Sequence, residues 1–259
     1  TLTYAEAEAQ VARIAEMLIR DFKLEPGNRV LLRGGNSIGM ALAWLAVVKA
    51  GLIVVPTMPL LRALELGKVI DKAQPALALC EVDLLEDMVL AAQDARGRLP
   101  ILAFGDPGRA DGLEQRAARR SPDHAGCATA ADDIALLAFT SGTTGVPKAV
   151  VTTHRDILAA CNTWPRHVLK MTPDDIVAGS PPLAFTFGTG GLLIYPMWAG
   201  ASVYYPDVRF SPETMVRKMR DNGITVCYTA PTFYRQMAPY AKALGIPSLR
   251  ICVSAGEAL

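Results

Sequence analysis

Short apolar segments alternate along this chain with segments of helix length, and this alternation constrains the fold more than any other feature. Residues 30–32, 53–55 and 77–80 are apolar at consecutive positions, as in strands that are buried on both faces. Residues 38–49 and 64–72 lie between them and are long enough for helices. Two parallel strands that are neighbours in a sheet need such a crossover helix between them. The pattern therefore predicts an α/β fold with a mostly parallel sheet and helices on both faces.

The alternation stops over residues 105–133 and then resumes as a second series. In this stretch, arginines are mixed with alanines, glycines and acidic residues, which predicts a mobile, solvated surface connector more than an anion-binding patch. The second series consists of expected strands at 134–139, 149–152, 176–178, 202–205, 225–228 and 250–253 and expected helices at 156–169, 191–197, 212–222 and 231–243. A second series of this length predicts a second sheet.

Composition and charge exclude several classes of function. The chain has 259 residues, of which 51% are hydrophobic, and 26 basic against 25 acidic residues give a net charge of +1. Such a chain has enough apolar surface to fold and no charge excess to attract a nucleic acid or an anionic membrane. Five cysteines without a C-x-x-C pair and three histidines without an i, i+4 partner predict no disulfide framework and no metal site. Residues 176–206 are free of charge, but their prolines and glycines favour buried loops and strands over a membrane helix, so we expect a cytoplasmic protein.

A loop rich in hydroxyl groups and glycine carries the clearest chemistry. Residues 139–148 read FTSGTTGVPK and follow an expected buried strand. Glycines let backbone N–H groups approach an anion, hydroxyls donate hydrogen bonds, and Lys148 supplies a charge suited to a polyphosphate. The G-x-x-G-x-x-K spacing differs from the Walker A motif, so a Walker-type ATPase is not favoured. On composition alone, a phosphate-binding loop and an ordinary Ser/Thr/Gly-rich turn both remain open.

Ordered motifs beyond this loop resemble one protein family. Residues 140–148 closely resemble the signature of the adenylate-forming (acyl-CoA synthetase, AMP-binding) superfamily. Further similar motifs follow in the expected order, at residues 2–6 (LTYAE), 26–30 (PGNRV), 49–56 (KAGLIVVP), 180–188 (SPPLAFTFG), 229–232 (TAPT) and 254–259 (SAGEAL). The resemblance covers nearly the whole chain and is nearest to aryl-CoA ligases of the benzoate and 2-aminobenzoate type.

The resemblance implies a reaction and its reactants. Members of the family activate a carboxylic acid with ATP to form acyl-AMP and pyrophosphate, and the acyl-CoA ligases then transfer the acyl group to coenzyme A. The implied cofactor set is ATP, Mg²⁺ and coenzyme A, with a small carboxylic acid as the partner and neither a nucleic acid nor a membrane. A homo-oligomer is left open. The implied fold is that of an incomplete N-terminal domain, with two stacked, mostly parallel sheets and helices on their faces.

Candidate site residues follow from the resemblance position by position. The residues that match the loop around the β- and γ-phosphates are Thr140, Ser141, Gly142, Thr143, Thr144, Gly145 and Lys148, with Lys148 as the catalytic charge. The residues that match the stretch along the adenine are Ala255, Gly256 and Glu257. The candidates for an apolar wall around a flat aromatic acid are Phe185, Phe187, Tyr228 and Ala230. Phe187 suits a core position equally well, and Phe185 stands where many relatives carry a histidine that gates the thiol channel.

The resemblance also implies how the chain is divided. Residues 1–27 would form a first helix that packs with the second subdomain, residues 28–175 a first α/β subdomain with the phosphate loop 140–148, and residues 176–259 a second, truncated subdomain. The threonine–glutamate pair for Mg²⁺ and the C-terminal domain with its adenylation lysine are expected beyond Leu259. The main catalytic residues would then lie outside this chain, and we expect the fragment alone to be inactive. A medium-chain acyl-CoA ligase and a non-catalytic nucleotide-binding protein of the same fold are the alternative functions.

Overall fold

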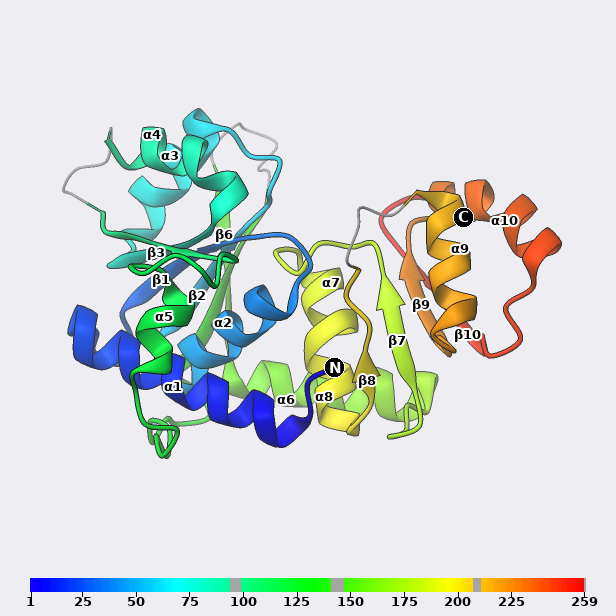
Figure 1. The fold of residues 1–259 in the computed structure, drawn as a ribbon, viewed down its shortest axis with the longest axis horizontal. Coiled ribbons are helices and arrows are strands. Elements are labelled where there is room, and N and C mark those ends of the chain that lie inside the picture. The colour runs from blue at the N-terminus through cyan, green and yellow to red at the C-terminus, as the bar shows by residue number, and fades with distance from the viewer. Residues whose placement is uncertain (94–98, 141–146, 207–210, 259) are drawn as a thin grey trace. The chain divides into compact units, whose positions relative to one another are not determined.

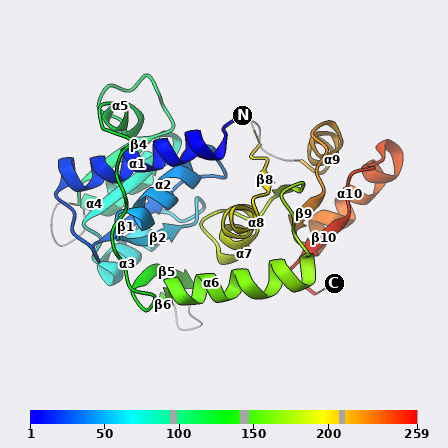
Figure 2. The same ribbon diagram turned by 90° about the horizontal axis from the view of Figure 1, so that it is seen from below.

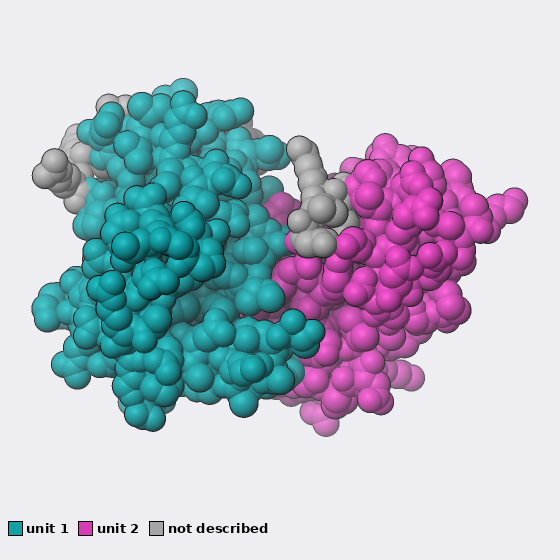
Figure 3. Space-filling view, viewed as in Figure 1, with its two compact units in different colours: residues 1–156 teal, residues 157–259 magenta. Residues whose placement is uncertain are grey.

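Two compact units make up the chain (Figure 3). The computed structural model describes residues 1–93, 99–140, 147–206 and 211–258 (Figure 1). Unit 1 comprises Thr1–Asp156 and unit 2 comprises Ile157–Leu259, so the division lies before the one expected after residue 175. Each unit holds one sheet with helices, which confirms the α/β class and the second sheet predicted from the sequence.

A six-stranded sheet forms the centre of unit 1, in the order β4-β3-β1-β2-β5-β6. Its strands are β1 (Arg29–Arg33), β2 (Ile53–Thr57), β3 (Leu77–Glu81), β4 (Ile101–Phe104), β5 (Ile134–Thr140) and β6 (Lys148–Thr153). Neighbours are parallel except β5 and β6, which run antiparallel. The carboxyl ends of β1, β2 and β5 therefore meet at one edge of the sheet, where the phosphate loop begins.

Helices cover both faces of this sheet (Figures 1 and 2). They are α1 (Tyr4–Phe22), α2 (Ile38–Lys49), α3 (Ala63–Ala73), α4 (Leu85–Gln93), which follows the short 3-10 helix η1 (Val82–Leu84), and α5 (Leu113–Ala118). One face packs against α3 and α4 through a buried cluster that includes Leu31, Val55 and Cys80. Because successive strand residues point to opposite faces, Val30 and Val54 face the other side, and both are fully buried. Burial on both faces explains the consecutive apolar positions in the sequence.

The first helix begins at a capping box formed by Thr3 and Glu6. The Thr3 backbone N–H and hydroxyl donate to Glu6 Oε2 at 2.8 and 2.7 Å, and the Glu6 N–H donates to Thr3 Oγ1 at 3.2 Å. These bonds satisfy N–H groups that the first turn of a helix leaves free. Helix α1 packs against α2 and α5, and these contacts place it in unit 1, whereas the expected division placed it with the second subdomain.

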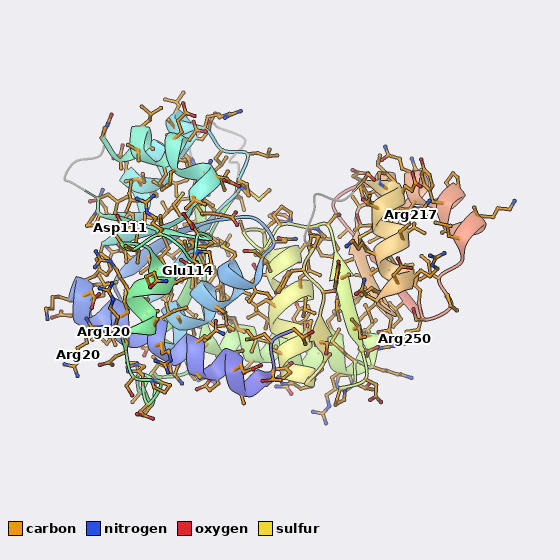
Figure 4. The ribbon with its side chains drawn as sticks, viewed as in Figure 1. Arg20, Asp111, Glu114, Arg120, Arg217 and Arg250 are labelled. Atoms are coloured by element: carbon orange, nitrogen blue, oxygen red, sulfur yellow. The ribbon has the colours of Figure 1, made fainter. Side chains whose placement is uncertain are left out.

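The arginine-rich stretch 105–133 is held against α1, where the sequence predicts a mobile connector. It contains helix α5, and Arg13 Nη1 of α1 donates to the Arg120 carbonyl oxygen at 2.5 Å. The Arg120 guanidinium pairs in turn with Asp21 of α1 (Figure 4). His124 Nδ1 lies 3.1 Å from Glu16 Oε2. Ion pairs across about a hundred residues fix this stretch, and a local pattern does not reveal them.

Unit 2 is built on a four-stranded parallel sheet in the order β10-β9-β7-β8. Its strands are β7 (Ile176–Gly179), β8 (Ser202–Val203), β9 (Val226–Thr229) and β10 (Ile251–Ser254). Its helical segments are the π-helix η2 (Trp164–Leu169), α7 (Thr186–Thr189), the π-helix η3 (Gly190–Ile194), α8 (Tyr195–Ala199), α9 (Pro212–Asp221) and α10 (Pro231–Leu244). Cys227 of β9 belongs to the core under α9 and α10, so its neighbour Tyr228 points to the opposite face.

Helix α6 (His154–Thr163) runs across the boundary between the units and then changes its hydrogen bonding. The sequence predicts one helix over 156–169, but the segment from Trp164 onwards is the π-helix η2. Pro165 has no N–H to donate, which explains why the regular α-helical ladder stops at this point.

A buried carboxylate joins the amino ends of three strands in unit 2. Asp175, just before β7, accepts hydrogen bonds from Thr225 Oγ1 and Arg250 Nε, both at 2.7 Å, and from the Thr172 N–H at 2.9 Å. Arg250, which Figure 4 labels, also donates from Nη2 to Asp175 Oδ2 at 2.5 Å. Burial raises the pKa of Asp175, but the hydrogen bonds from Arg250, Thr225 and Thr172 outweigh burial and hold this pKa below its usual value. The network fixes the strands at the edge opposite their carboxyl ends.

Candidate functional site

The two ends of the phosphate loop are paired across a β-ladder in unit 1. Thr140, the last residue of β5, is the register partner of Lys148, the first residue of β6. The Thr140 hydroxyl donates to the Lys148 carbonyl oxygen at 3.5 Å, and both residues are exposed. The candidate residues Ser141, Gly142, Thr143, Thr144 and Gly145 lie outside the described residues. The ladder fixes where the loop starts and where Lys148 lies.

Within the described part of the chain, the Lys148 ammonium group has no ion-pair partner and is free to bind an anion. Lys148 is an exposed residue at the start of the edge strand. An ammonium group at this point is a strongly hydrated charge on a flexible stem, suited to follow a polyphosphate. The role that the sequence predicts for Lys148 stays a prediction.

A buried arginine organises the same edge of the sheet, and the sequence analysis missed it. Arg33 ends β1 and is 1% exposed. Its Nη1 donates to the Met58 carbonyl oxygen at 3.0 Å, and its Nη2 donates to those of Pro59 and Leu61 at 3.1 and 2.8 Å. Burial lowers its pKa. The guanidinium thus fixes the segment that follows β2, and β2 lies beside β5, the strand that leads into the loop 140–148. A charged residue at the end of an apolar strand is the sequence feature that could have pointed to Arg33.

In unit 2, two of the four predicted acid-binding residues form an aromatic wall, defined here as Phe187, Gly191 and Tyr228. The rings of Phe187 and Tyr228 are tilted by 60° with centroids 5.6 Å apart, a favourable geometry for aromatic pairs. Tyr228 is 1% exposed, and no hydrogen bond of ordinary length and angle reaches its buried hydroxyl oxygen. Burial raises the pKa of Tyr228, and a weak hydrogen bond from the Trp164 side chain partly counters that rise.

Glycine is required where the Tyr228 ring meets the backbone. A Cβ at Gly191 would lie 2.5 Å from two ring carbons of Tyr228, and a Cβ at Gly179 would lie 2.5 Å from the Tyr228 carbonyl oxygen. Real Cβ atoms do not approach so closely, so any side chain at these positions would displace the ring or the strand. One edge of the ring therefore lies against Gly191 of η3, and the main chain of Tyr228 lies against Gly179 of β7.

The other two predicted wall residues lie apart from this ring contact. Phe185 precedes α7 and is 47% exposed, so its ring faces solvent in the described structure. Ala230 is half-buried and precedes the first residue of α10. Between Tyr228 and Ala230, the buried Thr229 hydroxyl lies 2.5 Å from Ser180 Oγ, a polar contact that the sequence analysis did not single out. The structure thus brings Phe187 and Tyr228 together and leaves Phe185 outside their contact.

The predicted adenine stretch follows β10 as an exposed loop. Gly256 has a φ of +94°, in the region that favours glycine. The Glu257 carboxylate accepts a hydrogen bond from the Thr232 N–H at 3.1 Å and another from the Thr232 hydroxyl. These bonds from Thr232, the side-chain bond first, lower the pKa of Glu257. The loop is therefore tied to the first turn of α10.

The described residues offer no cation site and no membrane-spanning helix. Among them, no group of three or more His, Cys, Asp or Glu side chains is placed to hold a metal ion. None of the helices found in these residues combines the length and the apolar character that crossing a bilayer demands.

Comparison with known proteins identifies the family. A family model described as "AMP-binding enzyme" matches residues 1–259. The chain belongs to this family. The match confirms the resemblance inferred from the loop 140–148 and from the ordered motifs around it.

Curated members of the AMP-binding family include aryl-CoA ligases similar to this chain. A 4-hydroxybenzoate–CoA/benzoate–CoA ligase of Rhodopseudomonas palustris is 30% identical over 264 residues, covering 100% of this chain and 48% of the relative. An anthranilate–CoA ligase of Pseudomonas aeruginosa is 29% identical over 266 residues, covering 100% of this chain and 49% of the relative. The chain thus spans about half the length of these relatives.

A solved structure of this family shares the fold. The anthranilate CoA ligase AuaEII in complex with anthranoyl-AMP superposes with a TM-score of 0.88 at 26% identity, covering 98% of this chain and 50% of that protein. The superposition confirms the adenylate-forming fold predicted for this chain.

Proposed function

We propose that this chain is the nucleotide- and acid-binding part of an acid–thiol ligase. The proposed reaction joins an aromatic carboxylic acid, of the benzoate or 2-aminobenzoate type, to AMP at the expense of ATP and then to coenzyme A. The observation that carries the proposal is the aromatic wall of unit 2, in which the buried Tyr228 hydroxyl has only a weak hydrogen bond from Trp164. The names of the similar relatives, benzoate–CoA and anthranilate–CoA ligases, support the same substrate class.

The wall favours a flat ring with a polar substituent over an alkyl chain. A buried hydroxyl without a good partner costs up to roughly 1–3 kcal/mol, which a ligand recovers if it offers a better donor or acceptor to Tyr228 than Trp164 does. An amino or hydroxyl group on an aromatic acid can do this, and its ring gains edge-to-face contact with Phe187 and Tyr228. A medium-chain acid such as octanoate would leave the hydroxyl poorly paired and would lose more rotational freedom.

The phosphate loop supplies the electrostatic part of the reaction. When the carboxylate attacks the α-phosphorus of ATP, the bond to the departing pyrophosphate breaks, and negative charge accumulates on the pyrophosphate oxygens. Lys148 and the hydroxyl and N–H groups of the loop that begins at Thr140 would hold these oxygens. Mg²⁺, when bound, would neutralise part of the same charge. The described residues include no carboxylate cluster to hold it, so no step is assigned to the ion.

Nucleotide binding tests the loop. Isothermal titration of ATP into the purified chain should give binding that Lys148→Ala weakens roughly tenfold or more, because the charge-assisted hydrogen bond is lost. Lys72→Ala, which removes an exposed charge from the last turn of α3, is the matched control and should bind like the wild type. Equal affinity of the Lys148 variant and the wild type would make the loop an ordinary turn. Absence of ATP binding by the wild type would refute the proposed function.

Acid binding and exchange chemistry separate the alternatives. Titrations with 2-aminobenzoate, benzoate and octanoate should give affinities that fall in this order, and preference for octanoate would favour a medium-chain ligase. The chain alone should show no ATP–pyrophosphate exchange, because it spans only about half the length of the similar ligases. Robust exchange would show that the residues described here are sufficient for the first half-reaction. Nucleotide binding without binding of any acid would favour a non-catalytic protein.

A further inference from the structure

Glu257 makes a contact that its neighbours in the predicted adenine stretch do not make. Its carboxylate lies against Thr232, which is 25 positions earlier in the chain, and its Oε2 accepts hydrogen bonds from both the N–H and the hydroxyl of Thr232. Thr232 is the second residue of α10. The side chain predicted to bind the nucleotide is therefore engaged with the start of a helix.

The start of α10 needs such an outside partner. Pro231, its first residue, has no N–H, and the preceding Ala230 has no side chain that could cap the helix. The first turn contains no acidic residue, so nothing within it complements the positive end of the helix dipole. Glu257 supplies both the acceptor for the Thr232 N–H and the missing negative charge. The positive charge of Arg235 in α10 also favours the ionised Glu257 carboxylate and helps to lower its pKa.

Gly256 fixes the loop from the other side. Its φ of +94° is a conformation that side chains rarely adopt, although nothing within 4 Å would obstruct a Cβ there. The backbone thus turns sharply at Gly256 so that the next side chain reaches α10. Between them, the turn and the bridge to Thr232 set the direction in which the backbone of residues 255 and 256 faces.

We propose that Glu257 is a positioning residue, which anchors the loop 255–258 to α10 so that the loop backbone, and not the Glu257 carboxylate, contacts the nucleotide. The proposal rests on the proposed function, because it concerns the adenine side of that site. It also connects two candidate regions along the chain: α10 begins directly after the segment Tyr228–Thr229–Ala230. The bridge therefore joins the nucleotide loop to the segment that carries the aromatic wall.

Paired variants distinguish anchoring from direct contact. Glu257→Gln weakens the acceptor, and Thr232→Val removes the hydroxyl while leaving the Glu257 carboxylate intact. Each should weaken AMP binding, measured by titration calorimetry, by roughly threefold to tenfold, as loss of a helix cap does. The double variant should bind AMP with the same affinity as the single variant that binds it less tightly, because both changes break the same bridge. Glu6→Gln is the matched control, since Thr3 and Glu6 make the same pair of bonds at the start of α1, and it should bind AMP like the wild type.

Hydrogen exchange gives a readout that needs no nucleotide. Amides of residues 253–258 should exchange faster in both bridge variants than in the wild type, while those of β1 stay unchanged. Weakened AMP binding by the Glu257 variant alone, with Thr232→Val at wild-type affinity, would show direct contact and overturn the proposal. Unchanged exchange in both bridge variants would overturn it as well. A wild type that binds no AMP, yet shows the expected exchange, would refute the proposed function and leave the anchor standing as a structural bridge.

Discussion

Replacing Tyr228 with phenylalanine should not destabilise unit 2, although the residue is among its most deeply buried. The change removes one oxygen whose burial is only weakly compensated by Trp164, which is worth up to roughly 1–3 kcal/mol, and leaves a void of one atom that costs a similar but smaller amount. The expected net effect is between zero and about 1 kcal/mol of added stability. In the same unit, Tyr205→Phe is the matched control: the Tyr205 hydroxyl donates to the Leu192 carbonyl oxygen at 2.5 Å. Its loss should cost about 1–3 kcal/mol, because a buried acceptor loses its donor.

Native-state hydrogen exchange of peptides from β9 measures both variants, since it reports on unit 2 without assuming that the chain unfolds in one step. A change of 1 kcal/mol corresponds to about a fivefold change in protection. Protection should rise or stay constant in Tyr228→Phe and fall in Tyr205→Phe. A loss of protection in Tyr228→Phe as large as in the control would show that the Tyr228 hydroxyl already has a good partner, and would remove the argument for recognition of a polar substituent.

Two further predictions concern packing and pH. Gly191→Ala places a methyl group 2.5 Å from the Tyr228 ring, so it should destabilise unit 2 by about 1–3 kcal/mol and weaken binding of aromatic acids; unchanged protection of β9 and unchanged titration of 2-aminobenzoate would contradict this. Asp175→Asn breaks the pair with Arg250, whose side chain is 37% exposed, and should cost about 2–3 kcal/mol at neutral pH, somewhat less than a fully buried pair. Because the folded-state pKa of Asp175 is lowered, its stabilisation is complete above the unfolded-state pKa of about 4 and is lost as the pH falls through the folded-state value. The difference between Asp175→Asn and the wild type in urea unfolding should therefore shrink below pH 4, and a constant difference would contradict the assignment.

Patterns that depend on neighbouring residues could be predicted from the sequence. The strands of unit 1 are buried on both faces, so consecutive apolar positions such as 30–32 reveal them, and the capping box at Thr3 and Glu6 needs only residues three positions apart. Glycines and hydroxyl groups around a lysine predict a phosphate-binding role for the loop 140–148 from adjacent residues too, and this role stays a prediction. These signals are local, and local propensity agrees here with the global fold.

Features that depend on distant residues could not be predicted. All four residues of β9 are buried, so the sequence contains no alternation to show that Tyr228 and Cys227 face opposite sides. Arg120 and Asp21 meet across 99 positions, and this pair turns an expected mobile connector into a packed segment. The hydrogen bonds of Glu257 go to Thr232, which is far away in sequence. The family motif at residues 254–259 contains no sign of this contact, so the motif predicted only that Glu257 lies along the adenine.

The close packing of Tyr228 against two glycines has a consequence for how this family can vary. The Tyr228 ring occupies the space of a side chain at residue 191, whereas the Tyr228 main-chain carbonyl oxygen occupies the space of a side chain at residue 179. Where evolution places a smaller residue at the position of Tyr228, a side chain becomes admissible at the position of Gly191 but not at that of Gly179. Sequences that keep a tyrosine there should keep both glycines. Correlated substitution at positions 191 and 228 would thus record how often the family has reshaped this wall, while the glycine at position 179 should stay.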